Sequence, residues 1–190
     1  MDWTDLLALT AIIWWPLIPL FWIPVHGLSR WARHIGLFIY ILIFLVWTPL
    51  AYILYINQSY LLGSKIDLPI IVNIIGWCFF ASGMILHIWT GLLLRPWGLI
   101  GLPEIFSKVE SKLVTTGPFS IVRHPTYLAH TFIFFGVFLL SEVIAAGVVA
   151  LLDLIIVYAI IIPLEERELL NRFGDEYRQY QQEVPRFIPF

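Results

Sequence analysis

Long stretches with almost no charge constrain this chain of 190 residues more than any other feature. A helix needs about 20 predominantly apolar residues to cross the hydrocarbon core of a bilayer. Five stretches contain at most one Asp, Glu, Lys or Arg side chain each, and the fourth is the shortest. We therefore expect five transmembrane helices, at roughly residues 6–24, 35–56, 69–94, 125–140 and 143–162.

The composition also favours an all-α, polytopic integral membrane protein. Hydrophobic residues make up 60% of the chain and charged residues only 13%, whereas about 25% of a soluble domain is charged. Strands exposed to lipid would leave backbone groups unpaired, and the alternation typical of a barrel is absent from the sequence. We expect Pro16 and Pro19 to make the first span irregular, and a tight hairpin at Ser141 and Glu142 to join the last two spans.

The basic residues predict the orientation of the five spans. Ten of the 11 Lys and Arg residues lie in the segments 25–34, 95–124 and 163–190, and only Lys65 lies on the other side. Basic residues concentrate in cytoplasmic segments of membrane proteins. We expect the N-terminus outside, and the C-terminus and any active site at the cytoplasmic face. The acidic start of the chain is unlike the basic start of a cleavable signal peptide, so we expect the first span to be retained.

Charge, cysteine and histidine usage argue against several classes of function. The net charge is −2 and no long basic run occurs, so we expect no nucleic-acid partner. Cys78 has no second cysteine to pair with, and we expect a small core residue there. His87, His124 and His130 fall at similar depths, but no HxxxH, HxxE or CxxC spacing accompanies them. We therefore expect no metal site.

An ionisable residue, Asp153, interrupts the fifth span. An ionisable side chain inside a membrane must find a partner or stay protonated. We expect a structural role for Asp153, with His130 or Ser82 as the partner.

The run Arg-His-Pro-Thr-Tyr at 123–127 marks the start of the fourth span. Proline suits the first turn of a helix, where its missing N–H is not needed. The helix should begin at Pro125, with its free N–H groups and positive dipole end at the inner interface. Such an end binds anions, and Arg123 adds a formal charge beside it. The alternative is that Arg123 only anchors the helix to lipid headgroups.

Adjacent carboxylates, Glu165 and Glu166, follow the fifth span. Such a pair is costly at a membrane boundary unless it is solvated or paired. For Glu166 and Glu168 we expect a solvated helix end. For Glu165 two possibilities stay open, namely solvation or an inward turn towards Arg123.

The C-terminal tail after Pro163 reads as helical and amphipathic. Gly174 and Asp175 should stop one helix and cap the next. The apolar positions fall on one helical face, which would lie on the membrane or cover the inner ends of the bundle. These positions are Leu169, Leu170, Phe173, Tyr177 and Val184.

Several of these runs together resemble one family of membrane enzymes. In order and spacing the chain is similar to the isoprenylcysteine carboxyl methyltransferases and the wider group that includes phospholipid N-methyltransferases. The resemblance covers about residues 100–190, and the first two spans match only as generic membrane helices. The matching runs are LVTTGPF at 113–119, VRHPTY at 122–127, EE at 165–166, FGDEY at 173–177 and VPR at 184–186.

The resemblance implies a bound S-adenosylmethionine, converted to S-adenosylhomocysteine, in a catalytic region 69–190 that follows a two-span region 1–68. Arg123 and Glu165 would lie at the substrate end as the catalytic pair. Two departures concern the family pattern: Phe119 stands where tyrosine is common, and Ile161 where an arginine is expected. By position, the cofactor site would consist of Glu104, Ser111, Lys112, Leu113, Val114, Phe119, His124, Pro125, Thr126 and Tyr127.

The chemistry of the methyl acceptor separates the roles of these two residues. A carboxylate is already ionised and needs a cation to place it, which fits Arg123. An amine arrives protonated and needs a base, for which Glu165 is the candidate. We expect methylation of the carboxylate of a prenylated cysteine or a similar lipid-tailed acceptor, with membrane lipids as the other partners. Alternatives are phospholipid N-methylation, a sterol-type reductase with a nicotinamide cofactor, and a haem-binding or transport bundle. The oligomeric state is left open.

Overall fold

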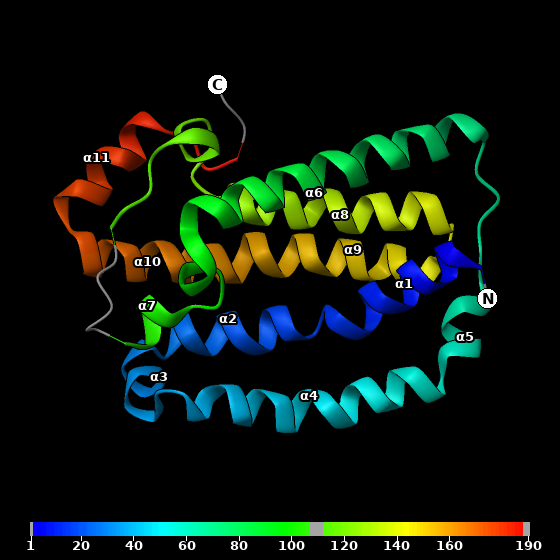
Figure 1. Ribbon diagram of the computed structural model, residues 1–190, viewed down its shortest axis with the longest axis horizontal. Coiled ribbons are helices and arrows are strands. Elements are labelled where there is room, and N and C mark those ends of the chain that lie inside the picture. The colour runs from blue at the N-terminus through cyan, green and yellow to red at the C-terminus, as the bar shows by residue number, and fades with distance from the viewer. Residues whose placement is uncertain (1, 107–111, 188–190) are drawn as a thin grey trace.

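The computed structural model describes residues 2–106 and 112–187, and these form a bundle of helices (Figure 1). Besides the α-helices, the chain has a short 3-10 helix, Gly117–Ser120, and a π-helical turn, Val157–Ile161. The α-helices are α1 Trp3–Trp14, α2 Leu17–Gly27, α3 Ser29–Ile35, α4 Phe38–Ile56, α5 Gln58–Gly63, α6 Ile70–Leu99, α7 Leu102–Ile105, α8 Pro125–Ser141, α9 Ile144–Ile156, α10 Ile162–Phe173 and α11 Asp175–Glu183.

Four helical segments are long and apolar enough to cross a membrane: Trp3–Gly27, Phe38–Ile56, Ile70–Ile105 and Ile144–Phe173. The predicted span at 125–140 is present as α8, an apolar helix of 17 residues. At 1.5 Å per residue its length is about 25 Å, slightly less than the roughly 30 Å of hydrocarbon in a bilayer. The protein is therefore an all-helical membrane protein, and the fifth crossing remains a prediction.

The first span is irregular, as its prolines predict. Helix α1 ends at Trp14 and α2 begins at Leu17, so the break falls at Trp15 and Pro16. The Trp15 indole N–H donates to Asp153 Oδ1 on α9 at 3.1 Å. The expected pairing of Asp153 with a histidine or serine is therefore wrong. The break in the first span turns an indole towards α9, and this donor binds one oxygen of the fully buried carboxyl group, while Oδ2 has no hydrogen-bond partner among the described residues.

The last two membrane helices form the predicted hairpin. Helix α8 ends at Ser141, Glu142 adopts a left-handed conformation with φ 61°, and α9 begins at Ile144. At the other end, α9 continues through the π-helical turn and Pro163 into α10 without a break. The predicted end of this span near residue 162 is thus not an end of the helix. The span carries on into the tail, and this continuity fixes where the first half of the tail lies.

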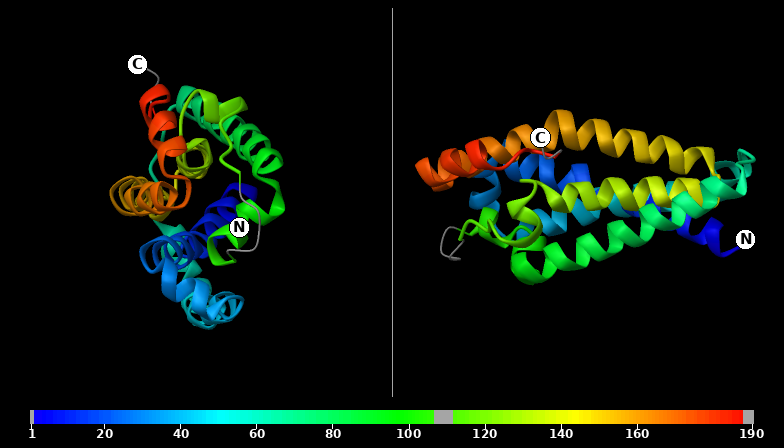
Figure 2. Two further views of the ribbon diagram at one scale, coloured as in Figure 1. Left: turned by 90° about the vertical axis from the view of Figure 1, so that its left-hand side faces the viewer. Right: turned by 90° about the horizontal axis from the view of Figure 1, so that it is seen from above.

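The tail and two short helices gather at one end of the bundle. Figure 1 shows α3, α7, α10 and α11 at this end, and the N-terminus and α5 at the opposite end. We call the end that holds α3, α7, α10 and α11 the site end. Seen from above (Figure 2, right), α11 lies beyond the membrane helices at the site end. The predicted apolar face of the tail is confirmed, because Tyr177, Tyr180 and Val184 form a buried cluster with Leu113 and Phe173. Asp175 does not cap α11; its carboxylate binds Arg178 instead.

Helices α6 and α8 approach each other with their backbones nearly in contact. An added Cβ at Gly136 would lie 2.6 Å from the Phe80 nitrogen, and one at Gly83 would lie 2.8 Å from the Ile133 nitrogen. No side chain larger than hydrogen fits at either position without a shift. Cys78, also on α6, is exposed rather than in the core, so that expectation is wrong. Its helix faces outward there, where lipid replaces protein as the neighbour.

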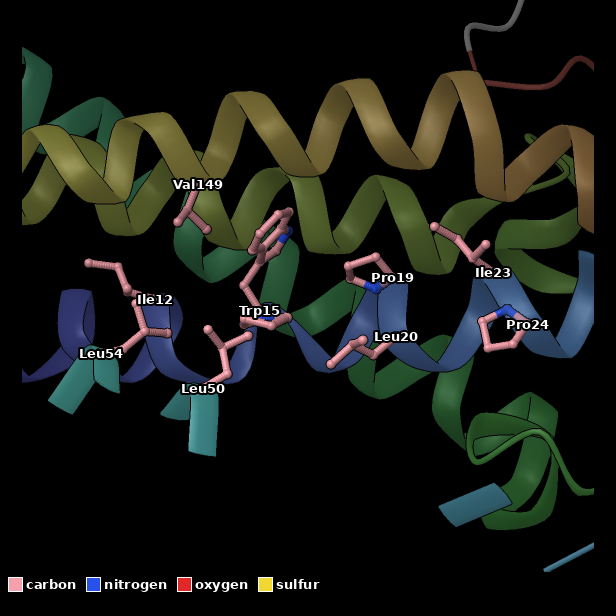
Figure 3. Close-up of a pocket in the computed structure, with 10 residues that line it drawn as sticks. Ile12, Trp15, Pro19, Leu20, Ile23, Pro24, Leu50, Leu54 and Val149 are labelled. Carbon is pink, nitrogen blue, oxygen red and sulfur yellow. The ribbon is translucent and has the colours of Figure 1, made fainter. Parts of the chain in front are cut away.

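A broad apolar groove of about 630 Å³ runs beside the break in the first span (Figure 3). Helices α1, α2, α4 and α9 surround it, and Trp15, Pro19 and Val149 are among the residues that line it. No ionisable side chain lines it. This groove can hold an apolar chain but contains no group for acid–base or polar chemistry.

The close contact of α6 and α8 predicts sensitivity to very small substitutions. Gly83→Ala and Gly136→Ala should each lower the free energy of unfolding by about 1–3 kcal/mol, because the added methyl meets backbone atoms that cannot move aside. Gly63→Ala is the matched control, since its Cβ would have no neighbour within 4 Å. Thermal unfolding in detergent measures the difference. Equal melting temperatures for the three variants would contradict this packing.

Candidate functional site

The site end of the bundle contains a cavity of about 1020 Å³. The first span, α6, α7, the loop at 112–119, α8, α10 and α11 all contribute to its wall. Most residues expected from the sequence line it, and they converge from segments far apart in the chain. These are Glu104, Lys112, Leu113, Val114, Phe119, Arg123, His124, Thr126, Tyr127 and Glu165.

Of the expected cofactor residues that the structure describes, only Pro125 does not line this cavity. Pro125 is buried as the first residue of α8, where it starts the helix as predicted. Ser111 lies outside the described residues. Conversely, three residues line the cavity although the sequence did not predict them there: Trp22, Arg172 and Tyr177. For Tyr177 the apolar face of the tail was a usable signal. Trp22 gave none, because the first span resembles any membrane helix.

The carboxylate of Glu166 lies at the centre of the polar network beside the cavity. Its Oε1 accepts hydrogen bonds from Arg123 Nε at 3.1 Å and Nη2 at 2.8 Å. Arg186 donates to both carboxylate oxygens, and His124 Nε2 lies 3.2 Å from Oε1. Glu166 is only 5% exposed. The expected solvated helix end is therefore wrong here: two guanidinium groups replace water around this carboxylate.

The guanidinium of Arg123 is committed to protein partners. Besides Glu166, its Nη1 donates to the backbone carbonyls of Gln181 at 3.0 Å and Val184 at 2.6 Å. The Arg123 backbone N–H also donates to the Pro185 carbonyl at 2.9 Å. These carbonyls lie at or just after the end of α11, where a cation also offsets the negative end of the helix dipole. Arg123 thus fastens the tail to the start of α8.

Glu165 binds His124 rather than Arg123. Its Oε2 lies 3.3 Å from His124 Nδ1, close enough for an ion pair although the two groups are not aligned as a hydrogen bond. Of the two possibilities for Glu165, the inward turn is observed, with a different partner. Burial lowers the pKa of His124, but Glu165 and Glu166 outweigh this effect and raise the pKa above its ordinary 6.5.

A second buried ion cluster joins α7 to α10. Arg172 Nη2 donates to Glu104 Oε1 at 3.0 Å and lies 3.4 Å from Glu168 Oε2. Glu168 is only 4% exposed, so the expected solvation is wrong for this residue too. Arg172 binds both carboxylates and keeps them from repelling each other. The cluster holds α7 against the cavity wall.

Several polar atoms of the cavity-lining residues are buried and lack a hydrogen-bond partner among the described residues. Natural structures satisfy nearly all buried polar groups, so unsatisfied ones call for an explanation. A polar ligand in the cavity would supply the missing partners. The atoms are His87 Nδ1, Glu104 Oε2, Thr126 Oγ1, His130 Nδ1, Glu165 Oε2, Arg172 Nε and Nη1, and Tyr177 OH. Within residues 2–106 and 112–187, no three His, Cys, Asp or Glu side chains are placed to hold a metal ion.

The chain belongs to the phospholipid methyltransferase family, whose sequence model matches residues 71–176. This match confirms the resemblance to membrane methyltransferases. It also extends the resemblance towards the N-terminus, because it includes most of α6. The family and the all-helical fold together establish a membrane protein of a methyltransferase family.

Individual relatives differ in the substrate that their names carry. Methanethiol S-methyltransferase 1 of Bradyrhizobium diazoefficiens is 33% identical over 116 residues, covering 57% of this chain and 39% of that protein. Methanethiol S-methyltransferase of Crocosphaera subtropica is 27% identical over 156 residues, covering 78% of this chain and 56% of that protein. Protein-S-isoprenylcysteine O-methyltransferase B of Arabidopsis thaliana is 32% identical over 93 residues, covering 47% and 45%.

The matched part of the chain thus spans from about two fifths to just over half of the length of these relatives. No solved structure matches the chain.

The paired histidine predicts how stability depends on pH. The pKa of His124 is raised in the folded protein, so its contribution to stability is full below the unfolded value near 6.5. This contribution is lost as the pH rises through the higher folded pKa. The melting temperature of the wild type should therefore fall as the pH rises from 6 through that value. In Glu166→Gln the fall should be smaller, because one of the two carboxylates that raise the pKa is gone. A wild-type melting temperature that rises over this range would contradict the assignment.

Proposed function

We propose that this member of the phospholipid methyltransferase family transfers a methyl group from S-adenosylmethionine to an acceptor with an apolar body or tail. The observation that carries this proposal is the cavity at the site end, where motif residues contribute buried polar atoms without partners. Such atoms favour a polar ligand over an empty or lipid-filled space. The acceptor would come from the bilayer that surrounds the bundle.

The residues of the cavity fit this cofactor in size and in chemistry. Small-molecule sites have volumes of about 300–1,000 Å³, so a cavity of about 1020 Å³ has room for a nucleoside, an amino-acid moiety and part of an acceptor. The free oxygen of Glu104 can accept a hydrogen bond from an ammonium group. The hydroxyl groups of Thr126 and Tyr177 can bond hydroxyl, carboxylate or ring-nitrogen groups. Leu113, Val114 and Phe119 offer apolar surface beside them.

When bound, S-adenosylmethionine supplies a methyl group on a positively charged sulfur. The chain has to hold the acceptor in line with that methyl group and keep water away, and such alignment can contribute about 7–11 kcal/mol. Arg123 and Glu166 serve this end by fastening the tail beside the cavity. Arg172 does the same for α7. In this arrangement the buried ion pairs hold the cavity wall in place, and the buried polar atoms that lack partners among the described residues bind the ligands.

A carboxylate acceptor, such as that of a prenylated cysteine, is the candidate that the sequence favours. The isoprenylcysteine relative supports it. In the structure, however, Arg123 already donates to Glu166, Gln181 and Val184. Binding a carboxylate there would break bonds that hold the tail. A carboxylate acceptor would therefore have to use another cation of the wall, and Arg95 and Lys112 are the exposed ones.

A thiol acceptor is the second candidate, and the occupied Arg123 favours it. Two of the relatives carry methanethiol in their names. A thiol is mostly neutral at neutral pH, since its usual pKa is about 8.5. It therefore needs no cation to bind, and it enters an apolar site at low cost. What it needs is a group that takes its proton.

We also propose the orientation that the basic residues predict, with the site end at the cytoplasmic face. S-adenosylmethionine is a polar cytoplasmic metabolite, so a cavity that binds it should open on that side. Three helices of the site end, α3, α10 and α11, carry five of the ten arginines and lysines of the described residues. Arg95, Lys112 and Arg123 line the cavity at this end.

Binding of S-adenosylhomocysteine tests the cofactor assignment. Tyr177→Phe and Thr126→Val should each weaken its binding about 3–10-fold, the equivalent of one net hydrogen bond. Neither change should lower the stability of the free protein, because the hydroxyl group has no partner there. Isothermal calorimetry in lipid nanodiscs gives the affinity, and thermal unfolding gives the stability.

The matched control for this test is Tyr180→Phe. The Tyr180 hydroxyl donates to the Phe119 carbonyl, so its removal should lower the stability. Affinities equal to wild type in both Tyr177→Phe and Thr126→Val would remove these groups from the site. If the wild type bound NADPH and no S-adenosylhomocysteine, the reductase alternative would replace the proposal.

Labelling at the two ends of the bundle tests the orientation. In a Cys78→Ser background, Asp67→Cys should react with a membrane-impermeant maleimide from outside intact cells. Arg178→Cys should react only after permeabilisation, because its side chain lies at the site end and is 68% exposed. Labelling of both variants from the same side would mean that an even number of crossings separates them.

A further inference from the structure

Two histidines from different helices meet in the cavity wall. His87 on α6 and His130 on α8 both line the cavity, and their ring centroids are 5.0 Å apart. The Nδ1 atom of each ring is buried without a hydrogen-bond partner among the described residues. The ring of His130 also meets that of Tyr127, a motif residue, at 6.1 Å. His130 thus has His87 of α6 as one ring neighbour and Tyr127 of the RHPTY motif as the other.

A close backbone contact between α6 and α8 holds this pair in place. Gly83, one turn before His87 on α6, faces the Ala129 carbonyl and the Ile133 nitrogen on α8, which flank His130. An added Cβ at Gly83 would lie 2.9 Å from that carbonyl oxygen. The two helices therefore cannot slide or separate without opening this contact. Rigid placement of this kind is what a reacting group requires.

No carboxylate binds either imidazole within the described residues, in contrast to His124. Without such a partner, a buried imidazole gains nothing from carrying a proton in the resting protein. In the neutral ring one nitrogen is an acceptor, and here the unpartnered Nδ1 can serve. Asp153 lies on α9, which packs against α8. The other ionisable groups that line the cavity together with the pair are Arg95, Glu104, Lys112, Arg123, His124, Tyr127, Glu165, Arg172, Tyr177 and Tyr180.

We propose that His130, positioned by His87, accepts the proton of a neutral thiol acceptor during methyl transfer. The S–H bond breaks and the proton goes to Nδ1 of His130, leaving its electron pair on the acceptor sulfur. That pair forms the new S–CH₃ bond as the bond between the methyl group and the sulfonium breaks, and the products are a methyl thioether and S-adenosylhomocysteine. The imidazolium then releases one proton to water.

The surroundings of the pair favour a thiol over the other acceptors. The cavity wall also includes Trp14, Leu17 and Leu93, which offer no charge to an ionic group. Next to such apolar side chains an ammonium or a carboxylate would lose part of its hydration, whereas a neutral thiol loses little. A carboxylate, being ionised already, would have no use for the two acceptor nitrogens. This inference rests on the proposed methyltransferase function.

Thiols of different acidity test the inference in the full-length protein in nanodiscs. The substrates are an alkanethiol, mostly neutral at pH 7, and an arenethiol, largely ionised there. His130→Gln should lower kcat/KM for the alkanethiol on the order of 100-fold. For the arenethiol, which needs no base, the loss should stay within about threefold. The pH–rate profile of the alkanethiol in this variant should follow ionisation of the thiol itself.

Two further variants separate chemistry from folding. His87→Gln should show the same contrast between the thiols with a smaller loss, and the affinity for S-adenosylhomocysteine should be unchanged in both variants. His26→Gln is the control, because His26 is also buried with both ring nitrogens unpartnered but does not line the cavity. It should not change the ratio of the two rates.

The outcomes that would overturn the inference are distinct from failure of the proposed function. Equal losses for both thiols in His130→Gln, or no loss with either, would remove the histidine from proton transfer. Methylation of a prenylcysteine carboxylate by the wild type, with no thiol methylated, would overturn the thiol assignment and leave the methyltransferase proposal intact. If the wild type did not bind S-adenosylhomocysteine, both proposals would fall.

Discussion

One buried carboxylate, that of Glu166, holds the site end of this protein together. It receives Arg123 and His124 from the start of α8 and Arg186 from the segment after α11. A buried charge without partners costs several kcal/mol, so none of these groups can leave alone. The consequence is cooperative: α8, α10 and the end of the tail keep their relative positions or lose them together. These elements also line the cavity, so the ion cluster fixes part of its shape.

The wall of the cavity combines this ion cluster with a rigid apolar scaffold. Contact between α6 and α8 at Gly83 and Gly136 leaves no room for adjustment, while the last membrane helix runs unbroken through the π-helical turn into α10. A π-helical turn shifts the helical register, and such turns are frequent at functional sites. Here it follows Asp153 and precedes the Glu165–Glu166 pair. The register of α10 brings one of these carboxylates to Arg123 and its neighbour to His124.

Features that depend on a local pattern could be predicted from the sequence. Contacts between side chains that are far apart in the chain could not. Charge-free stretches located the membrane helices, and Pro125 located the start of α8. The tail face followed from its spacing. Which of two adjacent carboxylates meets Arg123 depends on where the α11 carbonyls lie, and spacing carries no such information. The Trp15 partner of Asp153 is 138 residues away. Glu168 gave no sign of burial, because its partner Arg172 also binds Glu104, which comes from a segment without periodicity.

The distribution of charge in the site has a consequence for the reaction. Arg123 and Arg186 both bind the carboxylate of Glu166, and Arg172 binds two carboxylates, so each of these guanidinium groups already has a partner within the protein. In a methyl transfer from a sulfonium, a positive charge leaves the reacting sulfur as the new bond forms. A fixed cation next to the acceptor would lower the nucleophilicity of its electron pair. A hydrogen bond from water to the same electron pair would lower it too. The neutral thiol that we propose would need no such cation beside His87 and His130, whose Nδ1 atoms have no partner among the described residues. The arginines thus bind other parts of the protein, whereas His87 and His130 each have an Nδ1 atom without a partner among the described residues.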